Sequence, residues 1–332
     1  MEITGCLFLI SCWYERYQVQ KRIAVFYAIN LLTAGFGNLL AYGINKLDGT
    51  GGYRGWRWIF IVEGLIPVAL ALLGWLVIVD FPDKVHEARR PFLNAEEVQI
   101  VKDRLEADRG DSEYDHLTVK KVLHTLCMWQ IWMYSLFFMG AAVAIYAYAY
   151  FTTVVLRGMG HSTERVFLLS APPCITAIPY TFAVAYMSDR TKLRSPFVLL
   201  NAGVTITGLM MTAYHTNNDV RYGGIFLGIV GCNGNLPSLL AWQANNIRGQ
   251  STRAVASALQ VAFGAIGGIY ASTTFMQKEA PTYTSGLWAA VAAQLFTIVG
   301  VVGMVIYYKV QNRKADRLHV AVEGSERFRY TY

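Results

Sequence analysis

The feature that most limits how this chain can fold is a run of about two dozen apolar residues between Tyr53 and Pro82. A helix of that length, at ~1.5 Å per residue, crosses a bilayer core of ~30 Å. Trp56 and Trp58 stand at its start, where aromatic side chains mark a membrane–water interface. Backbone polar groups in lipid must be paired within their own segment, so the run is predicted to be a helix. One carboxylate, Glu63, lies inside it.

Similar apolar runs recur along all 332 residues, of which 54% are hydrophobic and only 15% are charged. An average soluble domain has ~25% charged residues. The chain is therefore predicted to be an all-α polytopic membrane protein whose first partner is the lipid bilayer. Its net charge of +7 is attributed to loop lysines and arginines that set membrane orientation, and no nucleic-acid partner is predicted. The five cysteines lie singly within apolar runs, so no disulfide, metal site or cofactor is predicted.

The runs divide the chain into four predicted parts. Residues 1–82 hold one apolar stretch too short to span, Ile3–Trp13, and two full spans, Ile23–Ile44 and Trp56–Phe81. Residues 83–125 form a polar linker with one helix, for which Asn94 is the predicted N-cap. Residues 126–308 hold six spans and residues 309–332 form a basic tail. The six spans are predicted at Leu126–Leu156, Val166–Met187, Pro196–Tyr214, Gly223–Trp242, Ala254–Phe275 and Leu287–Tyr308.

Loop charges give an orientation for this map. If the loops are numbered alternately, 22 of the 29 lysines and arginines fall in one set and 7 in the other. Cytoplasmic loops of membrane proteins carry the excess of positive charge. The linker and the tail are therefore predicted to be cytoplasmic.

This arrangement resembles the major facilitator superfamily, in which a long basic loop separates two sets of six spans. The second set is complete here, and the residues before the linker correspond to the end of helix 4 and to helices 5 and 6. Ala185–Arg194 (AYMSDRTKLR) resembles the superfamily's G-x-x-x-D-R-x-G-R-[RK] loop, at the place of its second copy. Gly55–Leu65 (GWRWIFIVEGL) resembles the hallmark of the fungal anion:cation symporter branch, which includes allantoate, nicotinate and pantothenate permeases. Cys12–Arg16 and Leu47–Gly49 resemble other parts of that branch.

The resemblance implies a secondary transporter, not an enzyme, that moves a small organic anion with protons across the plasma membrane. Such carriers rock two bundles around a site at the middle of the membrane. Because the first three and a half helices of the family plan have no counterpart here, the alternative is a truncated or degenerate relative that does not transport. A receptor or an enzyme is disfavoured, since no soluble sensor or catalytic domain is visible.

Polar side chains within the spans are the candidate site residues. Glu63 is the proton-coupling candidate, because an ionisable group inside a span is costly; the alternative is that it pairs with a neighbouring helix near the interface. Gly231–Pro237 (GCNGNLP) is predicted to interrupt its span. Each substrate-binding candidate could instead serve helix packing or an interfacial belt. These candidates are Asn38, Tyr146, Tyr150, Asn233, Asn235 and Gln260.

A charge cluster at the predicted cytoplasmic end of one span is the last candidate. Asp189, Arg190 and Arg194 belong to the superfamily-like loop. They are predicted to form a latch between the two bundles that favours one conformation.

Overall fold

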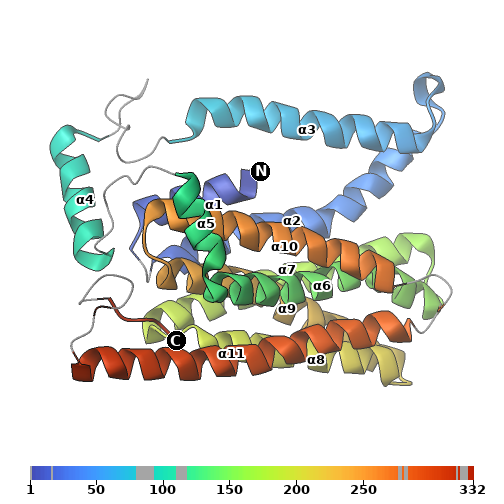
Figure 1. The fold of residues 1–332 in the computed structure, drawn as a ribbon. Helices are drawn as coiled ribbons and strands as arrows, with labels where there is room; N and C mark the ends of the chain where they lie inside the picture. The colour runs from blue at the N-terminus through green and yellow to red at the C-terminus, as the bar shows by residue number, and fades with distance from the viewer. Residues whose placement is uncertain are drawn as a thin grey trace.

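The computed structural model describes residues 2–15, 18–79, 93–109, 118–275, 279, 283–318, 321 and 328–332, and the regular elements in these ranges are all helices (Figure 1). Before the linker they are α1 (Glu2–Trp13), α2 (Val19–Asn45), the short 3₁₀ helix η1 (Thr50–Gly52) and α3 (Gly55–Val77). The next two are α4 (Ala95–Arg109) and α5 (Val119–Cys127). Six long helices follow: α6 (Trp129–Gly158), α7 (Thr163–Thr191), α8 (Ser195–Tyr214), α9 (Asn218–Asn246), α10 (Gln250–Thr274) and α11 (Thr284–Leu318).

Eight of these helices are long and apolar enough to cross a membrane. They are α2, α3 and α6 to α11, which confirms the eight predicted full spans. The α1 helix has only 12 residues, in agreement with the short first stretch. The long helices run side by side in Figure 1, with α4 at one end of the bundle, which we call the linker end.

The linker region contains one predicted helix and one that was not predicted. At the start of α4 the Asn94 backbone N–H donates to Glu97 Oε2 at 2.8 Å, which confirms Asn94 as the N-terminal boundary. The predicted start of the next span at Leu126 is wrong, because α5 ends at Cys127 and α6 begins only at Trp129. Met128 between them has extended backbone (φ −76°, ψ 110°), which breaks the helix.

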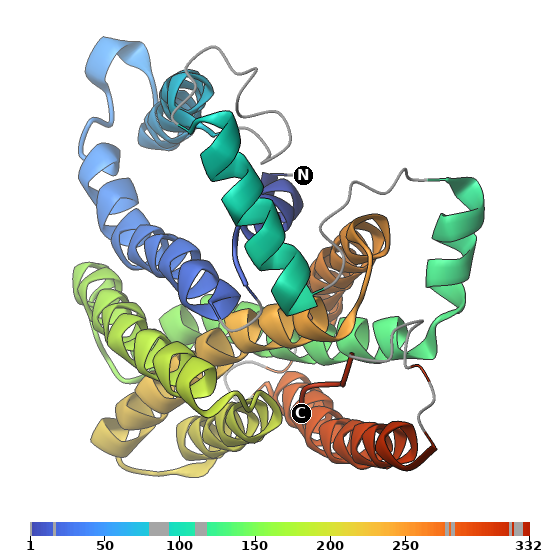
Figure 2. The same cartoon turned by 90° about the vertical axis from the view of Figure 1, so that its left-hand side faces the viewer.

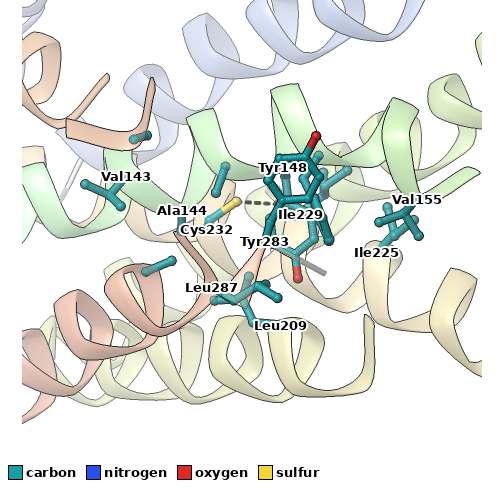
Figure 3. Close-up of a cluster of buried hydrophobic side chains, with 14 of the residues drawn as sticks. Val143, Ala144, Tyr148, Val155, Leu209, Ile225, Ile229, Cys232, Tyr283 and Leu287 are labelled. Carbon is teal, nitrogen blue, oxygen red and sulfur yellow. Dashed lines mark hydrogen bonds between the residues drawn. The ribbon is translucent and has the colours of Figure 1, made fainter. Parts of the chain in front are cut away.

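The six long helices enclose a core in which Tyr148 of α6 lies against Ile229 and Cys232 of α9 (Figure 3). The backbones of α8 and α9 come very close together, since a Cβ atom built on Gly208 would lie 2.3 Å from the backbone nitrogen of Gly228. Only glycines permit that separation, because any side chain would meet the backbone of the facing helix.

The helices before the linker differ in how far they are covered. The α2 helix packs against α7 and also touches α9, and α1 packs against α10. By contrast, α3 stands away from the bundle in Figure 2, and among its described residues only Gly55 is buried. Large apolar side chains on α3 are exposed, for example Phe60 at 73% and Trp75 at 77%.

Candidate functional site

The middle of α9 carries the first part of the candidate site. Residues 231–247 are all buried. Asn233 Nδ2 donates to the Ile229 carbonyl at 2.8 Å, so its amide is used within its own helix. Neither side-chain polar atom of Asn235 has a hydrogen-bond partner among the described residues, although its exposure is 0%. A buried unpaired polar group costs ~1–3 kcal/mol, so Asn235 is the amide available to a ligand.

Gln260 of α10 faces the same part of α9. Its Nε2 lies 3.4 Å from the Leu239 carbonyl, its Oε1 has no described partner, and the side chain is fully buried. Leu239 lies one turn after Asn235 on α9, so the two amides belong to one face of the α9–α10 contact. One turn beyond Gln260, a Cβ on Gly264 would lie 2.6 Å from the Phe138 ring of α6. The two amides therefore lie where α6, α9 and α10 meet.

The two candidate tyrosines form a separate aromatic group on α6. The rings of Tyr146 and Tyr150 stack with centroids 6.4 Å apart, and the side chains are 38% and 49% exposed. The Tyr146 ring covers Gly268 of α10. Tyr150 lines a cavity of about 270 Å³, together with Phe151, Val154, Ser272, Phe275 and Tyr283.

The structure does not bring all substrate-binding candidates together. Tyr146 and Tyr150 lie beside Gly268 and Ser272, which are 8 and 12 residues after Gln260 on one helix. At ~1.5 Å per residue these intervals are about 12 and 18 Å, longer than a small organic anion. The amides and the tyrosines thus lie at two successive positions along the contact between α6 and α10. Asn38 lies in α2, but its side chain is outside the described part of the chain.

The predicted break of the helix at Gly231–Pro237 is wrong, because α9 is continuous from Asn218 to Asn246. Its glycines serve close packing instead. A Cβ on Gly231 would lie 2.6 Å from Thr205 Oγ1, and one on Gly234 would lie 3.0 Å from the Tyr180 ring. The α9 helix thus continues through Pro237, with close contacts to α7 and α8 at these glycines.

Two further polar side chains near α9 were missed by the sequence analysis. Tyr180 Oη of α7 donates to Asn201 Oδ1 of α8 at 2.7 Å, and Asn201 Nδ2 has no partner within the described residues. Both lie against Gly234, next to Asn235. The only signal in the sequence is a polar residue inside an apolar run, which does not distinguish these two from residues that serve packing.

Two of the three residues of the predicted charge latch lie together in one buried cluster, whereas their latching role stays a prediction. Asp189 and Arg194 form an ion pair of 2.7 Å with side-chain exposures of 1% and 0%. Arg194 also donates to Ser188 Oγ at 3.0 Å and to Gln20 Oε1 of α2. Arg190 is exposed and stays outside the cluster.

Gln20 extends this cluster to a third helix. Its Nε2 donates to Ser238 Oγ of α9 at 3.0 Å, and its side chain is buried. A pre-linker helix is thereby joined to α8 and α9 by buried polar contacts at the linker end. Sequence analysis did not identify Gln20, since 174 residues separate it from Arg194.

Glu63 lies on an exposed part of α3. The described residues provide it with no hydrogen bond or ion pair, and its predicted proton-coupling role stays a prediction. Across the described ranges, no group of three or more histidine, cysteine, aspartate or glutamate side chains could hold a metal ion.

The described chain is thus a bundle of helices long and apolar enough to cross a membrane, with buried amides and an inter-helix charge cluster, which is the architecture of a multi-pass membrane protein. The family model of the Major Facilitator Superfamily matches residues 1–272, and the chain belongs to that superfamily. It is 30% identical over 306 residues to the MFS-type transporter cnsO of Penicillium expansum, covering 89% of this chain and 58% of that protein. It is 28% identical over 309 residues to the high-affinity nicotinic acid transporter of Saccharomyces cerevisiae, covering 92% and 56%.

The solved structures agree with the fold. The proton:xylose symporter XylE aligns with a TM-score of 0.64 over 91% of this chain and 66% of its own length, at 16% identity. The predicted all-α fold and the resemblance to fungal members of the superfamily are thus confirmed, and the relatives are named as transporters, not enzymes. The chain spans little more than half the length of the two curated relatives named above.

Proposed function

We propose that this chain forms part of a secondary active transporter that takes up a small organic anion together with protons. The observation that carries the proposal is the pair of buried amides, Asn235 and Gln260, with polar atoms unpaired where α6, α9 and α10 meet. The unpaired Nδ2 of Asn235 can donate to a carboxylate, and a buried unpaired donor gains a full hydrogen bond when it does so. The unpaired atom of Gln260 is its acceptor Oε1, so Gln260 would donate to the anion through Nε2, which now makes a 3.4 Å contact with the Leu239 carbonyl. Similarity to a high-affinity nicotinic acid transporter supports a carboxylate such as nicotinate. The resemblance of Gly55–Leu65 to the anion:cation symporter branch adds pantothenate and allantoate.

The proposal includes an order of events along α6 and α10. Tyr146 and Tyr150 meet the anion first, because both are exposed, their rings stack and Tyr150 lines the cavity. Asn235 and Gln260 then bind it deeper in the bundle. Asn38 of α2 and Asn233 of α9 are kept as further substrate-binding candidates, although the Asn233 amide bonds the Ile229 carbonyl of its own helix.

The membrane arrangement is also part of the proposal. Residues 1–82 form part of an N-terminal bundle, 83–125 the linker, 126–308 the C-terminal bundle and 309–332 the tail. The excess of lysine and arginine in the linker and the tail supports a cytoplasmic position for both, in a protein of the plasma membrane.

The competing proposal is a chain that does not transport. Its support is the exposure of α3, whose apolar surface has little cover within the described structure. The two proposals are separated by uptake of labelled nicotinate, pantothenate and allantoate into fungal cells that lack their own carriers for them. Uptake above empty-vector cells supports the transporter. Correct membrane insertion without uptake, while a complete relative transports in the same cells, supports the competing proposal.

Replacing Asn235 by leucine tests the site directly. The variant removes a buried unpaired amide, so the free energy of unfolding is expected to rise by about 1–3 kcal/mol while uptake is lost. Thermal unfolding in detergent and uptake are measured together. The control is Asn218→Leu, at the exposed start of α9, which is expected to leave uptake unchanged. Retained uptake in Asn235→Leu would remove this residue from the site.

Glu63→Gln tests proton coupling. The glutamine keeps the size and polarity of the side chain but cannot release a proton, so uptake in a complete relative with the matching glutamate is expected to lose its dependence on external acidity. Uptake is compared between acidic and neutral medium for both proteins. An unchanged pH dependence would end the assignment of Glu63.

A further inference from the structure

The segment Phe328–Tyr332 lies at the linker end, which Figure 2 views directly, with three residues buried and Arg329 and Tyr332 half-buried. Phe328, Tyr330 and Thr331 are exposed by only 3, 7 and 8%. Such burial is unusual for five residues without regular structure, because their backbone polar groups need partners. Helices α9 and α11, and the N-cap residue of α8, Arg194, supply those partners.

Two asparagine side chains form hydrogen bonds with the backbone of this segment. Asn246 of α9 accepts from the Thr331 backbone N–H at 2.7 Å and donates to its carbonyl at 3.0 Å. Asn312 of α11 does the same for Tyr330, at 2.9 and 2.8 Å. A side-chain amide has the donor and acceptor geometry of a peptide group, so each pair imitates one rung of a β-ladder.

Aromatic and charged contacts also hold the side chains of this segment. The Tyr330 ring stacks on Tyr308 of α11, with centroids 4.3 Å apart and an interplanar angle of 14°. Trp242 Nε1 of α9 donates to the Thr331 carbonyl at 2.9 Å. Arg329 pairs with Asp316 of α11 at 2.7 Å. The segment is thus held through its backbone and through its side chains.

The same segment touches the charge latch. The backbone N–H of Arg194 donates to the Tyr332 carbonyl at 3.2 Å. The side chain of that same Arg194 bonds Asp189 and Gln20 of α2. Whatever fixes the backbone of Arg194 therefore also fixes the contact between α2 and α8.

We propose that Phe328–Tyr332 is an intramolecular ligand of a peptide-binding groove formed by α8, α9 and α11, and that its docking stabilises the latched, closed state of the linker end. Release of the segment frees the backbone of Arg194 and shifts the protein toward the state in which α2 and α8 separate at that end. The proposal concerns the conformation of the protein. It rests on the proposed transport function only for the role that the opening of this end has in transport.

Docking is tested with trypsin, which cleaves after Arg329. Thr331→Pro removes the N–H that Asn246 accepts and is expected to speed cleavage of the Arg329–Tyr330 bond about tenfold or more, since cleavage follows the undocked population. Thr331→Ala keeps that N–H and is the matched control, with a rate close to that of the unchanged protein. Mass spectrometry measures the rates, and each is divided by the rate for the same chain unfolded. Both substitutions lie outside the helices, so the bundle remains folded.

Asn312→Ala provides the same test from the groove side and is expected to give a similar increase. Equal cleavage rates in Thr331→Pro and Thr331→Ala would overturn the docking. The link to the latch is tested by spin labels at exposed Val25 of α2 and exposed Leu200 of α8, in a chain whose native cysteines are alanine. Thr331→Pro is expected to add a longer-distance population that Thr331→Ala lacks. Identical distance distributions would overturn the link, and neither readout depends on uptake.

Discussion

Replacing Arg194 by methionine is expected to lower the free energy of unfolding by about 3–5 kcal/mol, among the largest effects of any single substitution in this chain. Arg194 and Asp189 are 0% and 1% exposed and lie 2.7 Å apart. Removing the guanidinium leaves the Asp189 carboxylate buried without its counter-charge. It also removes the contacts to Ser188 and to Gln20 of α2.

Two variants separate this loss of charge pairing from a general loss of packing. Arg190→Met removes an exposed arginine four residues earlier and is expected to change stability by less than ~0.5 kcal/mol. Asp189→Asn combined with Arg194→Met leaves no unpaired charge and is expected to regain much of the loss. Thermal unfolding in detergent gives the comparison. If Arg194→Met costs no more than Arg190→Met, the buried latch is not a stabilising contact.

The same contacts also predict how the latch affects the conformations used in transport. It joins a helix before the linker to two helices after it, so it stabilises only conformations in which these ends are together. Neutralising Asp189 should therefore change the balance between conformations more than the affinity for substrate. A change confined to affinity would contradict a latch.

The spans could be predicted from the sequence because lipid imposes one strict rule on every segment. A helix must be about 20 apolar residues long, and that signal is local. The break at Met128 was not predicted, because α5 carries apolar residues up to the start of α6 and hydropathy alone does not separate them. The end of α11 at Leu318 could likewise not be predicted, because the rule about lipid applies only to apolar segments.

The candidate site was predictable in type but not in detail. The amides of α9 stood out as polar residues in an apolar run, yet only the structure separates Asn233, which bonds its own helix, from Asn235, which has no described partner. The motif around Asp189 predicted a cluster of Asp189, Arg190 and Arg194, of which the structure pairs only Asp189 and Arg194. The contacts of Gln20 and of the Phe328–Tyr332 segment could not be predicted, since they join residues as much as 218 positions apart.

The contact between α8 and α9 leads to the second large effect. A Cβ on Gly208 would lie 2.3 Å from the nitrogen, 2.6 Å from the Cα of Gly228 and 2.7 Å from the Gly224 carbonyl. These are backbone atoms, so no side-chain rotation can relieve the clash and the helices must separate. Gly208→Ala is therefore expected to cost at least ~3 kcal/mol, the upper end of the usual penalty for overpacking.

Gly203→Ala on the same helix is the matched control, and its expected effect has the opposite sign. No atom lies within 4 Å of a Cβ at Gly203, so alanine gains its better helix propensity of about 0.5–1 kcal/mol without a clash. Separation of α8 from α9 would also move Asn201 away from Gly234, next to Asn235. Gly208→Ala should thus weaken substrate uptake as well as stability, whereas Gly203→Ala should preserve both. Equal unfolding temperatures for the two variants would show that α8 and α9 do not need this close approach.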